Sequence, residues 1–300
     1  MSFPRAVEVE KGKSSLKESR NSNRGHGWRP KKRLGQNFLR EKGVVHSIIS
    51  LARFDPSSSV LEVGPGLGAL TLPLSQKVGH VYAVEKDAQL VERLGEELNR
   101  KSVANVTLTN QDILRMDFET LPVPPGERIG VIGNLPYNIS TPFLERLLDN
   151  RKKVGKAVLM FQKEVARRLI ASPGSREYGS LTVLIQYHAR IFPLLDVPRS
   201  AFYPVPKVDS MVIGLDFEKP HEPRVSDEEN LKRVVRSAFS HRRKTLLNSF
   251  KGSPYSFAPD ELRKACEACS IDTGKRAEAL TIDDFICLSS RVFLTSQGTG

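Results

Sequence analysis

A glycine-rich loop lies between a short apolar run and a second apolar segment that favours a helix. Residues 60–63 (Val-Leu-Glu-Val) predict a buried strand, residues 64–69 (Gly-Pro-Gly-Leu-Gly-Ala) form the loop, and a helix is expected to begin near Leu70. Glycines allow the backbone to approach a ligand closely, and this order of strand, loop and helix is typical of a nucleotide-binding doubly wound sheet. We therefore expect an α/β fold with a ligand at the loop.

Two acidic residues follow the next two predicted strands. Residues 81–84 predict a strand that ends at Glu85, about 20 residues after the loop, where a carboxylate can accept hydrogen bonds from both hydroxyls of a ribose. Residues 106–108 predict another strand, and Asp112 after it can accept a hydrogen bond from an adenine amine. The loop also fits the dinucleotide pattern, so a nicotinamide-dependent enzyme is an alternative. Hydride transfer requires neither Asp112 nor the turn described next, which argues against that alternative.

A further apolar run, residues 129–132, leads into Asn134-Leu135-Pro136-Tyr137. The amide oxygen can accept a hydrogen bond, the proline stiffens the backbone so that the carbonyl before it is aimed, and the tyrosine offers a flat stacking face. Together these groups suit a planar base that carries an exocyclic amine. The four residues alone would equally fit a strand-end turn with a half-buried tyrosine, but their position after the glycine loop favours a site.

The chain is strongly basic, with a formal net charge of +12 over 300 residues and a pI of about 9.7. Such a charge favours a polyanionic partner. Residues 1–33 hold ten Lys and Arg against three Glu. Residues 1–28 have almost no apolar periodicity, so we expect a disordered tail. An electrostatic arm for RNA and a solubilising extension are equally consistent with that tail.

Three cysteines, Cys266, Cys269 and Cys287, all lie in the last 35 residues. Their odd number argues against a disulfide framework. A zinc site would need about four ligands, and no histidine or further cysteine pair lies nearby, so we expect buried thiols and no metal. No apolar stretch approaches the ~18 residues of a membrane span, and the first 30 residues lack an apolar signal core, so a cytoplasmic location is expected.

The C-terminal third begins with a stiff aromatic and proline segment at residues 202–210, where prolines would hold Phe202 rigidly. Prolines and charges at residues 218–226 indicate a linker. Helices are expected beyond it, over residues 227–239, 244–250, 259–269 and 282–293. Arg242, Arg243 and Lys244 form a basic cluster among them, which is either a phosphate-binding site or a solvated patch. The charge of the whole chain favours RNA.

Five motifs occur in one order along the chain: Leu34-Gly35-Gln36-Asn37-Phe38-Leu39, residues 62–68, residues 133–140, residues 202–208 and Arg242-Arg243-Lys244. Together they closely resemble the ribosomal RNA small-subunit adenine dimethyltransferases of the kasugamycin-resistance type. The resemblance runs from about Arg29 to residue 294, and five motifs in order are far more specific than any one of them. The long N-terminal tail departs from the usual bacterial pattern.

The resemblance implies a Rossmann-like methyltransferase domain over residues 29–218 and a smaller all-α RNA-binding domain over residues 219–300. It implies S-adenosylmethionine as the cofactor. The implied substrate is a pair of adjacent adenosines near the 3′ end of 16S rRNA, dimethylated at N6 in the 30S particle during ribosome biogenesis. It also implies a protein that acts as a monomer.

The resemblance further assigns roles to residues. For the cofactor these are Asn37 and Leu39 at the methionine end, Gly64 and Gly66 in the loop, Glu85 at the ribose, Asp112 at the adenine, and Asn134. For catalysis they are Asn134, Leu135, Pro136, Tyr137 and Phe202, and for RNA binding Arg242, Arg243 and Lys244. An adenine amine is a poor nucleophile because its lone pair is delocalised into the ring. We expect acceptors on Asn134 and Leu135 to hold the amine, and Tyr137 and Phe202 to stack on the extruded base.

Two other functions remain open at this point. A related 23S rRNA adenine methyltransferase that confers macrolide resistance would use the same chemistry on a different RNA. The segment at residues 202–210 and the Arg242 cluster favour the small subunit. A ribosome-assembly factor whose methylation is secondary belongs to another class, and it can coexist with the enzyme.

Overall fold

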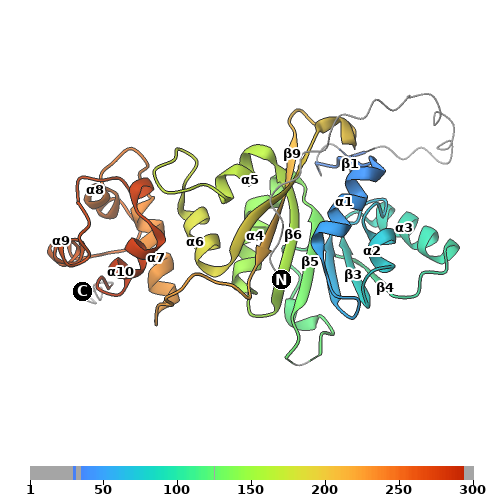
Figure 1. The fold of residues 1–300 in the computed structure, drawn as a ribbon, viewed down its shortest axis with the longest axis horizontal. Helices are drawn as coiled ribbons and strands as arrows, with labels where there is room; N and C mark the ends of the chain where they lie inside the picture. The colour runs from blue at the N-terminus through green and yellow to red at the C-terminus, as the bar shows by residue number, and fades with distance from the viewer. Residues whose placement is uncertain (1–29, 32–34, 125, 294–300) are drawn as a thin grey trace. The chain divides into compact units, whose positions relative to one another are not determined.

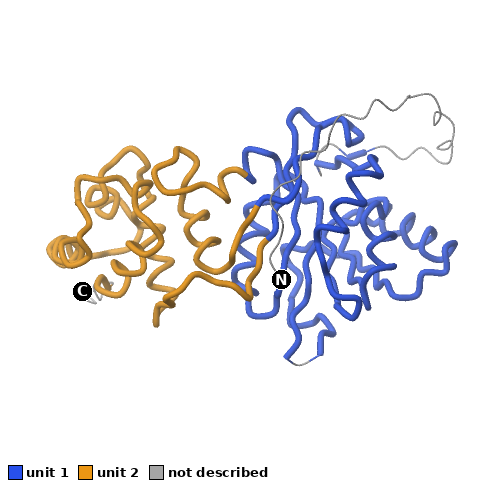
Figure 2. Tube along the Cα trace, in the orientation of Figure 1, with its two compact units in different colours: residues 1–166, 193–214 blue, residues 167–192, 215–300 orange. Residues whose placement is uncertain are grey.

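The computed structural model describes residues 30–31, 35–124 and 126–293, so the tail expected at residues 1–28 lies outside the described residues. The chain divides into two compact units (Figure 2). Unit 1 comprises residues 1–166 and 193–214, and unit 2 comprises residues 167–192 and 215–300. The sequence-based boundary at residue 218 groups residues 167–192 with the first domain instead, and the expected domain limits stay a prediction.

A seven-stranded sheet forms the centre of the α/β part, in the order β4-β3-β2-β5-β6-β9-β7 (Figure 1). Its strands are β2 (Ser59–Val63), β3 (His80–Glu85), β4 (Val106–Asn110), β5 (Ile129–Asn134), β6 (Val154–Gln162), β7 (Arg190–Val197) and β9 (Ser210–Asp216). The strands from β4 to β6 run parallel, and β2 lies between β3 and β5. The strand order reverses at β2, which places a ligand crevice at the carboxyl ends of β2 and β5. The expected α/β fold is confirmed.

Five helices precede, connect or follow the parallel strands in the chain. They are α1 (Lys42–Ala52), α2 (Thr71–Ser75), α3 (Ala88–Arg100), α4 (Ser140–Asp149) and α5 (Lys163–Leu169). Helix α3 shows why they form: Asp87 caps its first turn by accepting a hydrogen bond from the Gln89 N–H, and Leu90, Leu94 and Leu98 are buried at helical spacing. A Cβ added to Gly68 would lie 2.5 Å from Leu94 Cδ1, so this glycine lets the loop pack closely on α3.

A separate two-stranded sheet joins β1 (Phe38–Leu39) to β8 (Phe202–Tyr203) in antiparallel register. Short 3-10 helices occur at η2 (Phe118–Thr120), η3 (Tyr137–Ile139) and η4 (Arg199–Ala201). The β1–β8 pair joins segments more than 160 residues apart, and the sequence patterns did not predict it. It holds residues 38–39 against the first two residues of the segment at residues 202–210.

Unit 2 is helical apart from its sheet strands. It contains α6 (Ser180–His188), α7 (Glu228–Ala238), α8 (Leu246–Lys251), α9 (Pro259–Ala268) and α10 (Ile282–Ser289), with the 3-10 helix η5 (Ala277–Ala279). The four helices expected after residue 226 are confirmed as α7 to α10. Asn230 is buried on α7 and donates hydrogen bonds to the Ser289 and Val292 carbonyls, which ties α7 to the end of α10.

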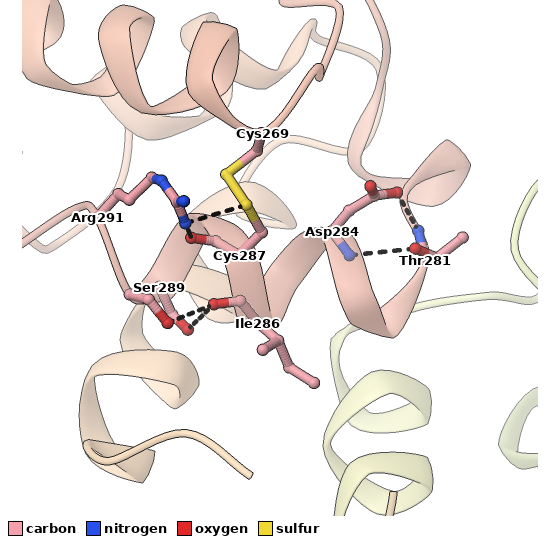
Figure 3. The surroundings of a disulfide bond; sticks show 8 residues. Cys269, Thr281, Asp284, Ile286, Cys287, Ser289 and Arg291 are labelled. Carbon is pink, nitrogen blue, oxygen red and sulfur yellow. Dashed lines mark hydrogen bonds between the residues drawn. A yellow bond between two sulfur atoms is a disulfide. The ribbon is translucent and has the colours of Figure 1, made fainter. Parts of the chain in front are cut away.

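The cysteine expectation is wrong for two of the three residues. Cys269, which directly follows α9, and Cys287, within α10, form a disulfide with their Cα atoms 5.9 Å apart (Figure 3). Cys266 is a buried free thiol, as expected. The pairing follows from the packing of α9 beside α10, which the spacing of the cysteines along the chain does not reveal.

No helix among the described residues is both long and apolar enough to cross a membrane. Within the same residues, no group of three or more His, Cys, Asp or Glu side chains is arranged to hold a metal ion.

Candidate active site

A cavity of about 160 Å³ opens at the carboxyl ends of β2, β3, β4 and β5 in unit 1. Five stretches of the chain supply its lining: residues 35–40, residues 62–67 with 69–70, residues 84–86 with Leu90, residues 111–113 and residues 134–139. The structure thereby brings together ten of the residues expected at the site: Asn37, Leu39, Gly64, Gly66, Glu85, Asp112, Asn134, Leu135, Pro136 and Tyr137. The cavity lies where the strand order reverses, as expected for this sheet topology.

The glycine loop presents bare backbone to the cavity. Gly64 and Gly66 have φ angles of +66° and +59°, which favour glycine. A Cβ added to Gly64 would meet no heavy atom nearer than Pro136 Cδ at 4.0 Å, and both residues line the cavity. A side chain at Gly64 would therefore be strained and would occupy space that a ligand could fill.

Glu85 ends β3 beside this loop, with only 8% of its surface exposed. Its carboxylate accepts hydrogen bonds from the Gly66 N–H at 3.2 Å and the Asp87 N–H at 2.9 Å. Burial raises the pKa of Glu85, and the N–H donors partly offset that effect. The carboxylate and the glycine loop therefore form one rigid unit.

Asp112 lies across the cavity after β4 and is ionised. Lys86 Nζ lies 2.7 Å from one carboxylate oxygen, and the Leu114 N–H donates to the other at 3.0 Å. The Lys86 hydrogen bond is the main reason that the pKa of Asp112 is lowered. Each carboxylate oxygen can accept a second hydrogen bond, so an amine donor from a ligand is compatible with these contacts.

The turn after β5 carries the groups expected to bind an adenine amine. Asn134 Nδ2 donates to the Asn37 backbone oxygen at 3.0 Å, which leaves Oδ1 as the acceptor of that side chain. The Leu135 N–H donates to the Met160 carbonyl at 3.3 Å, and this bond orients the peptide that follows β5. Tyr137 is half-buried in η3 with its hydroxyl 3.5 Å from Ser210 Oγ, and burial raises its pKa.

The sequence analysis did not identify Glu62, a buried acid with a raised pKa that lines the cavity. Glu62 lies in β2 and is 1% exposed, and its Oε2 has no hydrogen-bond partner among the described residues. The pKa of Glu62 is raised to about 7, mainly by burial and to a smaller extent by the nearby Glu85, while Thr71 partly offsets the increase. The feature of the sequence that could have identified Glu62 is its position as a single acid inside the apolar run of residues 60–63.

A second missed residue, Asp87, holds the N-terminal segment against the cavity. Its buried carboxylate lies 2.7 Å from Lys31 Nζ and accepts a hydrogen bond from Gln36 Nε2 at 2.9 Å. Gln36 Oε1 in turn accepts a hydrogen bond from the Lys31 backbone N–H at 2.7 Å. These contacts fix the stretch at residues 35–40 as one wall of the cavity.

The remaining expected site residues lie elsewhere among the described residues. Phe202 is 3% exposed in β8, opposite Leu39 of β1, and it does not belong to the cavity lining. Its stacking role stays a prediction. Arg242, Arg243 and Lys244 are exposed between α7 and α8 in unit 2, and Arg242 Nε lies 3.9 Å from the Glu278 carboxylate. Their role in RNA binding also stays a prediction.

A family model described as ribosomal RNA adenine dimethylase matches residues 27–292. Two curated relatives are named ribosomal RNA small subunit methyltransferase A. The one from Desulforapulum autotrophicum is 44% identical over 263 residues, covering 88% of this chain and 92% of the relative. The one from Geobacter sulfurreducens is 45% identical over 275 residues, covering 89% and 96%.

Two solved structures are similar in fold. A dimethyladenosine transferase from Plasmodium falciparum matches with a TM-score of 0.71 and 26% identity, over 85% of this chain and 99% of that chain. The 23S rRNA methyltransferase ErmE matches with a TM-score of 0.65 and 25% identity, again over 85% and 99%.

Proposed function

The chain belongs to the ribosomal RNA adenine dimethylase family, which confirms the resemblance drawn from its motifs, and from this membership we propose its substrate and cofactor. The protein transfers methyl groups from S-adenosylmethionine to N6 of two adjacent adenosines near the 3′ end of 16S rRNA in the 30S particle. One observation supports this above the others: a single cavity is lined both by the glycine loop with its acids and by the turn at residues 134–137. The names of the curated relatives support the small subunit as the source of the RNA.

Two features of the cavity suit S-adenosylmethionine: its glycine loop and its acidic residues. The backbone at Gly64 faces open space, and the Glu85 carboxylate is already aligned with the loop through the Gly66 N–H. In this assignment Glu85 holds the ribose hydroxyls, Asp112 the adenine, and Asn37 and Leu39 the methionine end. When bound, this cofactor supplies an electrophilic methyl group carried on a positively charged sulfur.

The turn after β5 orients the nucleophile. Asn134 Oδ1 and the Leu135 carbonyl accept hydrogen bonds from the adenine amine, which localises the nitrogen lone pair and directs it away from the two acceptors. Tyr137 stacks on the extruded base, whose removal from the RNA stack exposes the amine. The transferred methyl makes the nitrogen cationic and strongly acidic, so its proton leaves to water without a dedicated base.

In this proposal, the part of the RNA that lies outside the cavity contacts positively charged side chains of unit 2. Three consecutive exposed side chains, those of Arg242, Arg243 and Lys244, concentrate positive charge at one position. We therefore expect them to contact phosphates rather than base edges. In this proposal the protein acts as a monomer in the cytoplasm, during biogenesis of the small ribosomal subunit.

A methyl-transfer assay tests the proposal against the 23S alternative, which the ErmE match keeps relevant. The substrates are 30S particles, free 16S rRNA and 23S rRNA, each with labelled S-adenosylmethionine, and the modified positions are mapped by primer extension. We expect dimethylation of adjacent adenosines near the 3′ end of 16S rRNA, and a rate lower by ~100-fold or more when Asn134 is replaced by alanine. Modification of 23S rRNA alone would overturn the assignment to the small subunit.

A further inference from the structure

An aromatic side chain lies exposed beside the wall of the cavity. Tyr203 in β8 is 49% exposed, and Arg40 Cζ lies 4.1 Å from the centre of its ring. Tyr203 pairs with Phe38 across the β1–β8 sheet. Two apolar residues that follow it in the same segment are also exposed, Val205 at 60% and Val208 at 44%.

This exposed group is joined to the cavity at both of its ends. Phe38 and Arg40 line the cavity, and the Arg40 backbone N–H donates to the Ala201 carbonyl at 2.8 Å. At the other end, Ser210 lies 3.5 Å from the hydroxyl of Tyr137, the expected stacking residue for the target base. The segment at residues 202–210, here called the rim, therefore contacts the cavity lining at residues 38–40 and at Tyr137 without being part of that lining.

The chemistry of the rim suits single-stranded RNA. An aromatic ring with a guanidinium beside it forms a flat, cationic stack, and every nucleobase offers a π-face to such a platform. Arg199 in η4, just before this segment, and Lys207 within it are both exposed, which adds positive charge for the phosphates on either side of a stacked base. Asp209 is the acid nearest to Lys207 in sequence, and one of its carboxylate oxygens already accepts the Arg199 backbone N–H. Asp196, the acid nearest to Arg199 in sequence, lies 2.9 Å from Lys163 Nζ.

We propose that Tyr203 and Arg40 bind the nucleobase next to the adenosine being methylated, stacking it at the rim while the target base occupies the cavity. This inference rests on the proposed function, because it requires an RNA substrate. It assigns Tyr203 to substrate positioning and not to the chemical step. The phenol hydroxyl is not needed, since the ring face makes the contact.

Steady-state kinetics of the full chain with the RNA that the wild type methylates tests this inference. Tyr203→Ala should raise the KM for RNA about tenfold, within the range measured when one stacking aromatic is removed, and leave kcat within about twofold. Tyr203→Phe should restore the wild-type KM because the ring is kept. Cofactor affinity, measured by calorimetry, should equal that of the wild type in both variants.

The salt dependence of RNA binding separates stacking from phosphate contact. Tyr203→Ala removes no charge, so the slope of log affinity against log salt should stay the same while the affinity falls. Phe293→Ala is the matched control, because Phe293 is an aromatic residue with 57% of its surface exposed but belongs to unit 2. It should leave the KM for RNA unchanged.

Three outcomes would overturn the inference. They are an unchanged KM for Tyr203→Ala, a KM raised as much by Tyr203→Phe as by Tyr203→Ala, and a loss of cofactor affinity that matches the rise in KM. The last would show that Tyr203 only supports the cavity wall through β1. Absence of methyl transfer by the wild type to any of the three RNAs would instead refute the proposed function, so the two failures are distinguishable.

Discussion

The side-chain nitrogen of Asn134 donates a hydrogen bond to the backbone oxygen of Asn37 over 3.0 Å, between residues 97 positions apart. Asn134 ends β5, and Asn37 directly precedes β1, so the bond joins the sheet to the N-terminal wall of the cavity. Because the amide nitrogen is engaged, the amide oxygen is the group left to accept a proton of the substrate amine. The contact thus fixes the position of the expected catalytic amide and determines that its oxygen is the atom available to the substrate.

Replacing Asn134 by alanine is expected to lower turnover by ~100-fold or more while cofactor affinity stays within roughly tenfold. The lost alignment of the amine acts chiefly on the transition state, which is why the two effects separate. Single-turnover methyl transfer and calorimetry with S-adenosylmethionine measure them. Asn99→Ala, at an exposed position of α3, is the matched control and should behave as the wild type. Unchanged turnover in Asn134→Ala would remove this residue from the mechanism.

Replacing Glu85 by alanine is expected to weaken cofactor binding by about 1 to 3 kcal/mol, the cost of removing a hydrogen-bonded charged partner. The substitution also leaves the Gly66 N–H without its acceptor, so the loop loses part of its alignment. Calorimetry gives the change in affinity directly. Glu96→Ala on the exposed face of α3 controls for the loss of one negative charge, and wild-type affinity in Glu85→Ala would reject Glu85 as the ribose ligand.

The buried acid Glu62 should make the stability of the protein depend on pH. Its pKa rises from an ordinary 4.5 to about 7 on folding, so the native state holds a proton that the unfolded chain has released between these values. Stability therefore falls as pH rises from 4.5 to about 7, by about 3 kcal/mol in all, and stays at the lower level above that.

Glu62→Gln lacks this titration and gives the test. The variant should gain about 3 kcal/mol relative to the wild type when denaturant unfolding at about pH 8 is compared with unfolding at about pH 5. Comparing one variant with the wild type at both pH values cancels the other titrating groups that the two proteins share. A difference between the proteins that is the same at both pH values would show that Glu62 is not protonated in the native state.

Replacing Arg242, Arg243 and Lys244 together by alanine should weaken RNA binding and reduce its salt dependence by a slope of about 0.7 to 0.9 for each charge that meets a phosphate. The identity of the modified adenosines should not change, because phosphate contacts carry no sequence information. A salt titration of 30S affinity measures the slope.

The matched control for this cluster is a triple alanine variant of Lys251, Arg263 and Lys264, three exposed cations at other positions of unit 2. It removes the same formal charge from the same unit. Equal slopes for the two triple variants would show the cluster to be an ordinary solvated patch. A shift in the modified adenosines would show that the cluster reads sequence.

The disulfide between Cys269 and Cys287 can be tested by counting the free thiols of the chain. A thiol reagent should find one free thiol per chain, Cys266, after denaturation without reductant, and three after reduction. Cys287→Ser should lower the free energy of unfolding by about 3 kcal/mol, the entropy of closing a loop of this length, whose cysteines are 18 positions apart. Reduced wild type should match the variant, and three reactive thiols before reduction would contradict the pairing.

The local patterns of the sequence were enough to locate the strands and helices that build the site. The apolar runs at residues 60–63, 81–84 and 129–132 became β2, β3 and β5 because the strands of a parallel sheet are covered on both faces. The glycine loop and the residues after each strand then had to meet, since the carboxyl ends of parallel strands lie on one edge of the sheet. Eight of the ten expected site residues in the cavity lining are there for this reason, and Asn37 and Leu39 are the two that come from outside the parallel sheet.

The tertiary structure alone decided which distant segments touch. The bond from Asn134 to Asn37, the pairing of Tyr203 with Phe38, the contact of Lys31 with Asp87 and the disulfide of Cys269 all depend on partners that no local pattern specifies. Glu62 is the clearest case, because its pKa is set by the burial of its carboxyl. Periodicity and spacing report the environment along one element, whereas desolvation and hydrogen bonding depend on every element packed around a group.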